Sequence, residues 1–320
     1  MLAAILFYFG VILLVSTGLT LWYCYYRTIL FHLALLLVLP VYCTVWLGRW
    51  IVPSAEYIRG ADGRVSPVAL GVAAACIVLI AAGTGALQRL LFAQNLAVQS
   101  RYGFRSGHPL ERIAHPTASL VASLGIYTAG VAALGWSATS ESITLDASGS
   151  LWPALQFGNL NLPLFEFAVA LISVLVYLVV SIGLRRTAVG RGLRALNANP
   201  ALAAAFGVNA TAAEWSVLLA GSICVAIAGF LIGVDSAIAP STGFRWLLSG
   251  AGAMILFGAT LGRSFYPFLL VGSGAVAVLF SLLARFLPAA WSETAGMLVV
   301  LGVLLAFPKG LVGAYQPPRR

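Results

Sequence analysis

The chain has 320 residues, of which 61% are hydrophobic and only 8% are charged. Soluble domains typically have about 25% charged residues, so this chain has too few charges to cover a surface that faces water. The composition therefore excludes an ordinary soluble enzyme. It predicts a membrane protein whose segments of roughly 20 apolar residues cross the hydrocarbon layer.

Nine apolar segments follow one another along the chain, and each is predicted to be a membrane-spanning helix. They cover residues 2–23, 29–48, 67–87, 117–136, 164–184, 215–233, 246–261, 267–283 and 294–307. The first lacks the basic start and the small-residue cleavage site of a signal peptide, so we expect it to stay in the mature protein. The last three are shorter or interrupted, so one of them is expected to be re-entrant or strongly tilted. The predicted fold class is an all-α, polytopic membrane helical bundle, one domain of residues 1–320 with about 8–9 transmembrane helices.

Charged and aromatic residues set the predicted orientation. The chain has 18 Lys and Arg against 9 Asp and Glu, a net charge of +9. Most of the basic residues fall in loops on one side if the N-terminus lies outside, and the positive-inside rule then places the C-terminus and the loop of residues 185–214 in the cytoplasm. The basic excess is thus explained by orientation and does not indicate nucleic acid. Tryptophans near the predicted boundaries are expected at the headgroup level: Trp22, Trp46, Trp50, Trp136, Trp215, Trp246 and Trp291.

The loop of residues 185–214 carries the clearest signals outside the spans. Asn199 is a typical N-cap, Pro200 suits the first turn of a helix, and the following alanines favour helix. Gly207 suits the C-terminal cap. A short helix over residues 200–206 is therefore predicted, and it is too short to be stable alone in water. Either it packs on its own bundle or it docks into a partner protein.

The same loop resembles a known family. Three of its features are similar to the cytoplasmic loop of permease subunits of branched-chain amino acid ABC transporters. They are two arginines after a span, a predicted turn at Gly190 and Gly192 within Gly-Arg-Gly-Leu-Arg-Ala-Leu, and an Ala-rich helix that ends in Phe-Gly-Val-Asn. The resemblance extends to residues 108–126, 250–274 and 304–311. It covers residues 67–313, which is most of the chain.

The resemblance implies a function and a set of partners. The chain would form half of a translocation pathway for branched-chain amino acids or a similar small solute, as a multi-pass protein of the bacterial inner membrane. Its partners would be a second permease subunit, two cytoplasmic ABC ATPase subunits and an external substrate-binding protein. No enzyme activity, metal or cofactor is expected on this chain, because ATP and Mg²⁺ would bind the ATPases and the sequence has no Gly-x-x-x-x-Gly-Lys-Ser/Thr loop. The implied ATPase-coupling residues are Arg191, Gly192, Arg194, Ala195, Asn199, Pro200, Ala204, Phe206 and Gly207.

Charged residues are rare inside the predicted spans, so the pathway is expected to be lined by neutral polar groups. The candidates are Thr17, Thr20, His32, Ser119, Ser123, Tyr127 and Ser222, with Thr44, Thr128, Ser173 and Ser273 as further hydroxyls. Each hydroxyl can equally serve as a hydrogen bond between packed helices. His32 is the strongest candidate, because a mid-span histidine is costly unless it has a partner.

Three alternatives stay open. His108, Glu111 and His115 would share one helix face and could ligate zinc in a membrane enzyme, although Pro109 and Pro116 limit that helix. The protein could instead be a non-transporting membrane scaffold. It could also be a permease for another small solute, such as urea or short amides.

Overall fold

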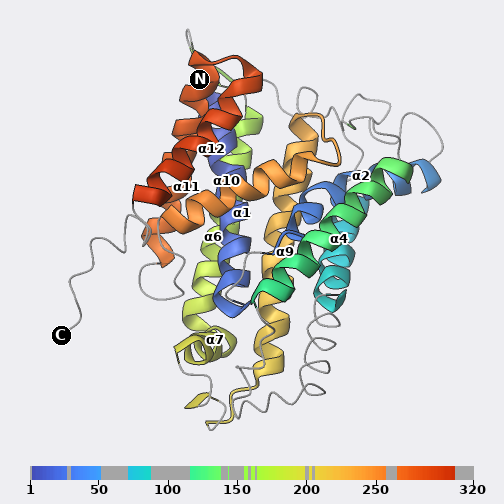
Figure 1. Cartoon of the computed structure of the whole chain (residues 1–320), viewed down its shortest axis with the longest axis vertical. Coiled ribbons are helices and arrows are strands. Elements are labelled where there is room, and N and C mark those ends of the chain that lie inside the picture. The colour runs from blue at the N-terminus through green and yellow to red at the C-terminus, as the bar shows by residue number, and fades with distance from the viewer. Residues whose placement is uncertain are drawn as a thin grey trace.

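The structure, a computed structural model, describes residues 2–26, 30–51, 71–87, 116–137, 143, 155–157, 160–162, 164–198, 202–203, 206–256 and 265–306. Its helices are α1 (Leu2–Tyr26), α2 (Leu33–Ile51), α4 (Pro116–Ser137), α6 (Leu164–Arg186), α7 (Ala188–Ala198), α9 (Ala210–Asp235), α10 (Thr242–Leu256), α11 (Phe265–Phe286) and α12 (Ala289–Ala306) (Figure 1). A further apolar helix covers Gly71–Leu87. All nine predicted segments contain a helix in the residues that the structure describes, and the membrane-bundle prediction is confirmed.

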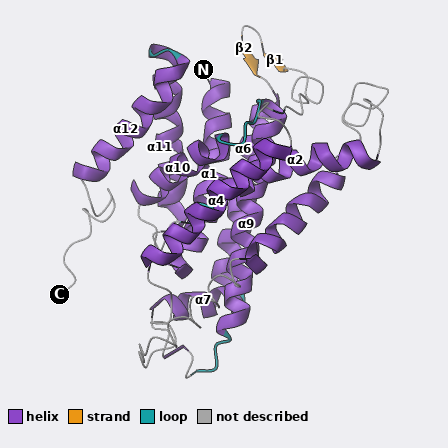
Figure 2. Ribbon diagram, turned by 45° about the vertical axis from the view of Figure 1, so that its right-hand side comes forward, coloured by secondary structure: helices purple, strands orange, loops and turns teal. Residues whose placement is uncertain are grey.

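Among the described residues, four helical stretches are long and apolar enough to cross a membrane: Leu2–Tyr23, Leu164–Arg186, Thr211–Asp235 and Leu269–Phe286. Shorter apolar stretches lie in α2, α4, α12 and the helix Gly71–Leu87. In chain order, a small antiparallel sheet of β1 (Leu155–Phe157) and β2 (Leu160–Leu162) comes after α4 and before α6 (Figure 2). The all-α prediction did not include this hairpin, because its strands have only three residues each.

The centre of the bundle is α1, which contacts α6, α9, α10 and α11. Every residue from 10 to 22 is buried, as expected for a helix that is apolar all round. By contrast, α6 has two faces. Its buried side carries Val169, Ser173 and Tyr177, while large apolar residues cover the opposite side: Phe167, Leu171, Leu175, Leu178 and Ile182. An apolar stripe of this length suits contact with lipid rather than water.

Glycines allow the central helices to touch through their backbones. A Cβ atom at Gly18 of α1 would lie 2.6 Å from the carbonyl oxygen of Gly221 in α9. Two turns further along α9, a Cβ at Gly229 would collide with the backbone of Leu37 in α2. Such close approach through small residues is the usual way in which helices associate in lipid.

The short helix α10 runs obliquely across α1 (Figure 1). Its 15 residues span about 22 Å at 1.5 Å per residue, less than the roughly 30 Å of hydrocarbon. Most of its side chains are buried, including Trp246. The expectation of a strongly tilted segment near the C-terminus is met by α10.

Contacts between segments that are distant in the chain agree with the predicted alternation of the loops between the two sides of the membrane. Ile143, after α4, and Ile238, after α9, form an antiparallel bridge with N–H···O distances of 3.0 and 2.9 Å. At the other end of the bundle, one cluster joins Leu21, Leu193 and Leu269. In both groups the residues come from chain segments that the charge pattern placed on the same side of the membrane.

The tryptophans near the predicted boundaries differ in burial, and their place at the headgroup level stays a prediction. Trp46, Trp136 and Trp291 are largely exposed. Trp22 and Trp246 are buried. Both rings pack between helices, where aromatic area fills the gaps left by small residues.

Candidate functional site

The end of α6 passes into α7 through a single residue, Thr187. Its hydroxyl donates to the carbonyl oxygen of Gly183 at 2.6 Å and accepts the backbone N–H of Gly190 at 3.0 Å. Thr187 is therefore the N-cap of α7 and also closes the last turn of α6. No sequence argument above identified it, although a threonine before a helix is a recognised N-cap signal.

Two arginines of α7 reach back to the end of α6. Arg191 Nη1 donates to the carbonyl oxygen of Arg186 at 2.9 Å, and Arg194 Nη2 donates to that of Arg185 at 3.2 Å. These carbonyls have no partner inside their own helix, and basic side chains are their usual partners. The arginines thereby fix α7 at an angle to α6.

The predicted turn at Gly190 and Gly192 is wrong, because both residues lie inside α7. A Cβ at Gly190 would collide with the backbone of Leu184. Glycine therefore serves here to let α7 pass closely over α6, while Thr187 supplies the turn. The low helix propensity of glycine is outweighed by this packing.

The short helix predicted over residues 200–206 is supported where the structure describes it. Leu202 and Ala203 are helical, and the backbone N–H groups of Phe206 and Val208 donate to their carbonyl oxygens, each at 3.1 Å. Gly207 has a φ of 76°, and the bond from Val208 to Ala203 is the six-residue bond of a Schellman cap. The capping prediction for Gly207 is thus confirmed. Asn199, Pro200 and Ala204 lie outside the described residues.

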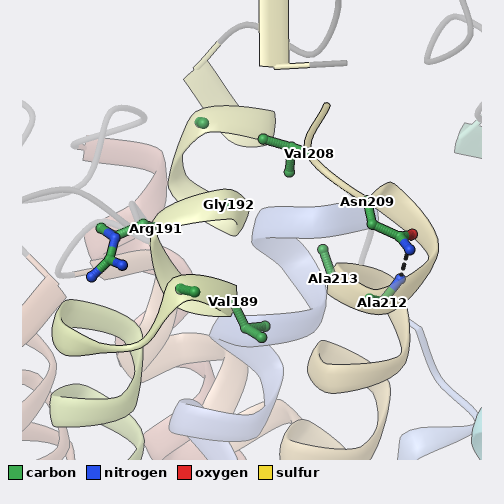
Figure 3. A pocket seen from close by; sticks show the side chains of 9 residues that line it. Val189, Arg191, Gly192, Val208, Asn209, Ala212 and Ala213 are labelled. Carbon is green, nitrogen blue, oxygen red and sulfur yellow. Dashed lines mark hydrogen bonds between the residues drawn. The ribbon is translucent and has the colours of Figure 1, made fainter. Parts of the chain in front are cut away.

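An apolar surface with a basic border lies at this end of the molecule. Phe206 is 80% exposed and Leu202 is 55% exposed. Two residues after Phe206, Val208 lines a groove of about 430 Å³ that separates α7 from the start of α9 (Figure 3). It is lined by Val189, Gly192 and Ala195 on one side and by Val208, Asn209, Ala212 and Ala213 on the other. We call Leu202, Phe206 and this groove the α7 surface.

Of the coupling residues that the structure describes, Arg191, Gly192, Ala195 and Phe206 belong to the α7 surface, whereas Gly207 caps the short helix and Arg194 bonds to the end of α6. The side chain of Arg191 points away from Val208 and Asn209, toward the side of α6 (Figure 3). Asn209 caps α9 by accepting the N–H of Ala212 at 3.1 Å. The groove is therefore apolar inside and basic at its border.

The predicted pathway residues do not form one group. Thr17 and Thr20 are buried in α1, and their hydroxyls donate at 2.6 Å to carbonyl oxygens four residues earlier. Thr44 and Ser173 do the same at 2.6 and 2.7 Å. These hydroxyls are satisfied by carbonyl oxygens of their own helices, and their place in the pathway stays a prediction. Ser16 and Ser273 lie 3.2 Å apart across α1 and α11.

A second group of pathway candidates does come together where α1, α2, α4 and α10 meet. His32 is 2% exposed, and its ring lies edge-on to Trp22 with centroids 5.4 Å apart. Ser123 of α4 accepts the N–H of Phe31 at 3.2 Å. Tyr127 stacks on Phe244 of α10 at 5.6 Å. We call these residues the His32 cluster; its aromatic members Trp22, Phe31 and Phe244 were not predicted as site residues.

The imidazole of His32 is the unusual member of this cluster. Within the described part of the chain, neither of its nitrogens has a hydrogen-bond partner. The Ser222 hydroxyl is likewise buried without a hydrogen-bond partner among the described residues. Thr128 is exposed, and the Ser119 side chain lies outside the described residues. A buried polar group without a partner requires an explanation.

The possible zinc ligands His108, Glu111 and His115 also lie outside the described residues. Among those that are described, no three His, Cys, Asp or Glu side chains are grouped as metal ligands would be.

Comparisons with known proteins were made on the whole chain. A sequence model of the family described as "Branched-chain amino acid transport system / permease component" matches residues 1–308. No curated protein matches the chain. Among solved structures, the chain is similar to a chain of "PsaBC from Streptococcus pneumoniae in complex with Fab", with 11% identity over 97% of this chain and 92% of that chain and a TM-score of 0.47.

Proposed function

Because the chain belongs to the family of permease components of branched-chain amino acid transport systems, it is a transmembrane permease of an ABC importer, and we propose that its α7 surface is the site where an ATPase subunit docks. A permease of this class works with ATPase and substrate-binding partners. The exposed Phe206 beside an apolar groove is the observation that carries the proposal.

The composition of the α7 surface suits a protein partner. Aromatic and arginine side chains are enriched at interfaces and carry much of their binding energy. Phe206 offers a large apolar ring, and Arg191 lies at the edge of the groove. The Schellman cap at Gly207 holds the ring in a fixed place, which lowers the entropy lost on binding.

The packing around α7 supports a role in transmitting movement. Helix α7 contacts α6, α9 and α1. Its inner side chains, Leu193 and Leu196, are buried in one cluster with Leu13 and Leu21 of α1 and Val217 of α9. Because packed interiors are dense and resist compression, a displacement of α7 by an ATPase would move three membrane helices together.

We place the α7 end in the cytoplasm of the bacterial inner membrane, with the N-terminus outside. Arg185, Arg186, Arg191 and Arg194 cluster there, and no Asp or Glu occurs between residues 185 and 213. Positive charge is retained on the cytoplasmic side, where ATP is available. ATP and Mg²⁺ would bind the two ATPase subunits, and no cofactor is proposed for this chain.

We place the substrate pathway beside the His32 cluster. Three acids occur in the long spans, and none lies near the middle of its helix: Glu166 in the first turn of α6 and Asp235 at the end of α9 stand at the ends opposite α7, and Glu214 lies near the start of α9. A neutral path suits a zwitterion with an apolar side chain, such as a branched-chain amino acid; urea or a short amide is the alternative cargo. Residues 1–320 would form one domain that supplies one half of this path, and a second permease subunit would supply the other half.

The docking proposal is tested with two matched phenylalanines. Phe206 is 80% exposed at the α7 end, and Phe286 is 77% exposed at the end of α11. Phe206→Asp should weaken co-purification of the ATPase by at least about 30-fold, because a central aromatic contributes about 2 kcal/mol or more to an interface. Phe286→Asp should leave it unchanged. Equal recovery of the ATPase with both variants would refute the docking role.

A further inference from the structure

A second groove, of about 370 Å³, opens on the other side of α7, where α6 and α9 separate. Its volume lies within the range of ligand sites. Its walls come from four helices and include Leu21, Val180, Gly183, Leu193, Val217 and Ala220. Val179, at its edge, is 69% exposed on the lipid-facing side of α6. The groove therefore opens toward the membrane rather than toward the α7 surface.

The inside of this groove offers almost no free polar group. Its two hydroxyl residues are Thr187 and Ser216. The hydroxyl of Thr187 is engaged by Gly183 and Gly190, and that of Ser216 donates to the carbonyl oxygen of Ala213 at 2.7 Å. A polar solute would lose its hydrogen bonds to water here without replacement. A hydrocarbon chain would lose none.

The polar end of the groove is strongly basic. Arg186 follows Gly183 by three residues and Val179 by seven, so it lies on the same face of α6, and it is exposed. The bonds from Arg191 and Arg194 to the carbonyls of Arg186 and Arg185 bring four arginines within about one turn of the end of α6. The first acid after them is Glu214, inside α9.

We propose that this groove binds an anionic phospholipid, with an acyl chain between α6 and α9 and its phosphate against Arg185 and Arg186. The headgroup supplies the selectivity, because every lipid has acyl chains of similar polarity, whereas basic residues at a membrane surface favour anionic lipids. Only Val189 lines both this groove and the α7 surface. A bound lipid would support α7 from the membrane side and leave the opposite side open.

The test uses the purified full-length permease without an ATPase, so its result does not depend on the docking proposal. Native mass spectrometry measures retention of phosphatidylglycerol and of phosphatidylcholine with the same acyl chains. The wild type should retain phosphatidylglycerol preferentially. Replacing Arg185 and Arg186 by Gln should weaken this retention about fivefold per arginine, and Arg285→Gln, at the far end of α11, should not. Equal retention of both lipids, or equal effects of the arginine variants, would overturn the proposal.

Two further arms distinguish a lipid from a simple anion. Val180→Trp fills the groove and leaves the arginines in place, so it should abolish the preference for phosphatidylglycerol while size-exclusion chromatography confirms a folded protein. If inorganic phosphate displaces the lipid from the wild type, the site binds a free anion and the lipid proposal is wrong. Should Val180→Trp not fold, the arginine variants, which are exposed, still decide the question.

Discussion

The interface between α1 and α9 and the junction between α6 and α7 are built by different means. At the first, Gly18 and Gly221 let two backbones touch, and apolar contact surrounds them. At the second, Thr187, Arg191 and Arg194 satisfy the ends of the helices with side-chain hydrogen bonds. Inside lipid, close packing is the main attraction between helices, whereas helix ends near water need polar caps. The two regions should therefore respond to different substitutions.

The strongest test of this comparison is Gly229→Leu in the core. The new side chain would collide with the backbone of Leu37, which cannot move without displacing α2. Overpacking of this kind typically destabilises a folded protein by about 1–3 kcal/mol. Because the collision here is with backbone atoms, we expect a loss at or above the upper end of that range. We expect little monodisperse protein on size-exclusion chromatography. Gly125→Leu is the control, because a Cβ at Gly125 meets nothing within 4 Å; similar loss in both variants would contradict the close-packed core.

A smaller and more local effect is expected for Gly190→Ala at the α6–α7 junction. Its Cβ would collide with the backbone of Leu184, whereas a Cβ at Gly192 would approach only a methyl group of Val208, at 3.1 Å. Gly190→Ala should displace α7 at a cost of about 1–3 kcal/mol and leave the melting temperature of the bundle nearly unchanged. Limited proteolysis should then cut within residues 187–198 faster than in Gly192→Ala. Equal cleavage in the two variants would show that α7 does not depend on this contact.

The comparison also explains what the sequence could predict. The bilayer fixes the length and polarity of a span, so each apolar segment became a helix, and residues 164–184 differ from α6 by only two residues at one end. Helix α7 was missed because two glycines among eleven residues are read as a turn when propensity is the only guide. The close contact of Gly190 with Leu184 favours a helix at this position despite the low helix propensity of glycine. This contact belongs to the tertiary structure and cannot be read from the local sequence.

The candidate pathway shows the same limit. The sequence could identify Thr17 and His32 as polar residues in apolar surroundings, but not their hydrogen bonds. Thr17 is satisfied by the carbonyl of Leu13, whereas His32 has no such partner among the described residues. Whether a buried polar residue serves packing or function depends on its partners, which only the assembled bundle defines.

The smallest effect on stability, with a clear effect on transport, is expected for His32→Leu. Replacing an unpaired buried polar group by an apolar one of similar size is near neutral or stabilising, so the melting temperature should stay the same or rise. If the imidazole meets the solute during transport, losing a hydrogen bond to a charged group should lower uptake about tenfold or more. Thr17→Val is the matched control: its hydroxyl bonds only within α1, and uptake should persist. Uptake unchanged in His32→Leu would remove His32 from the pathway, and a lower melting temperature would assign it to packing. A fall in uptake with an unchanged melting temperature would show that the His32 cluster serves transport, in contrast to the close-packed interface between α1 and α9, which serves stability.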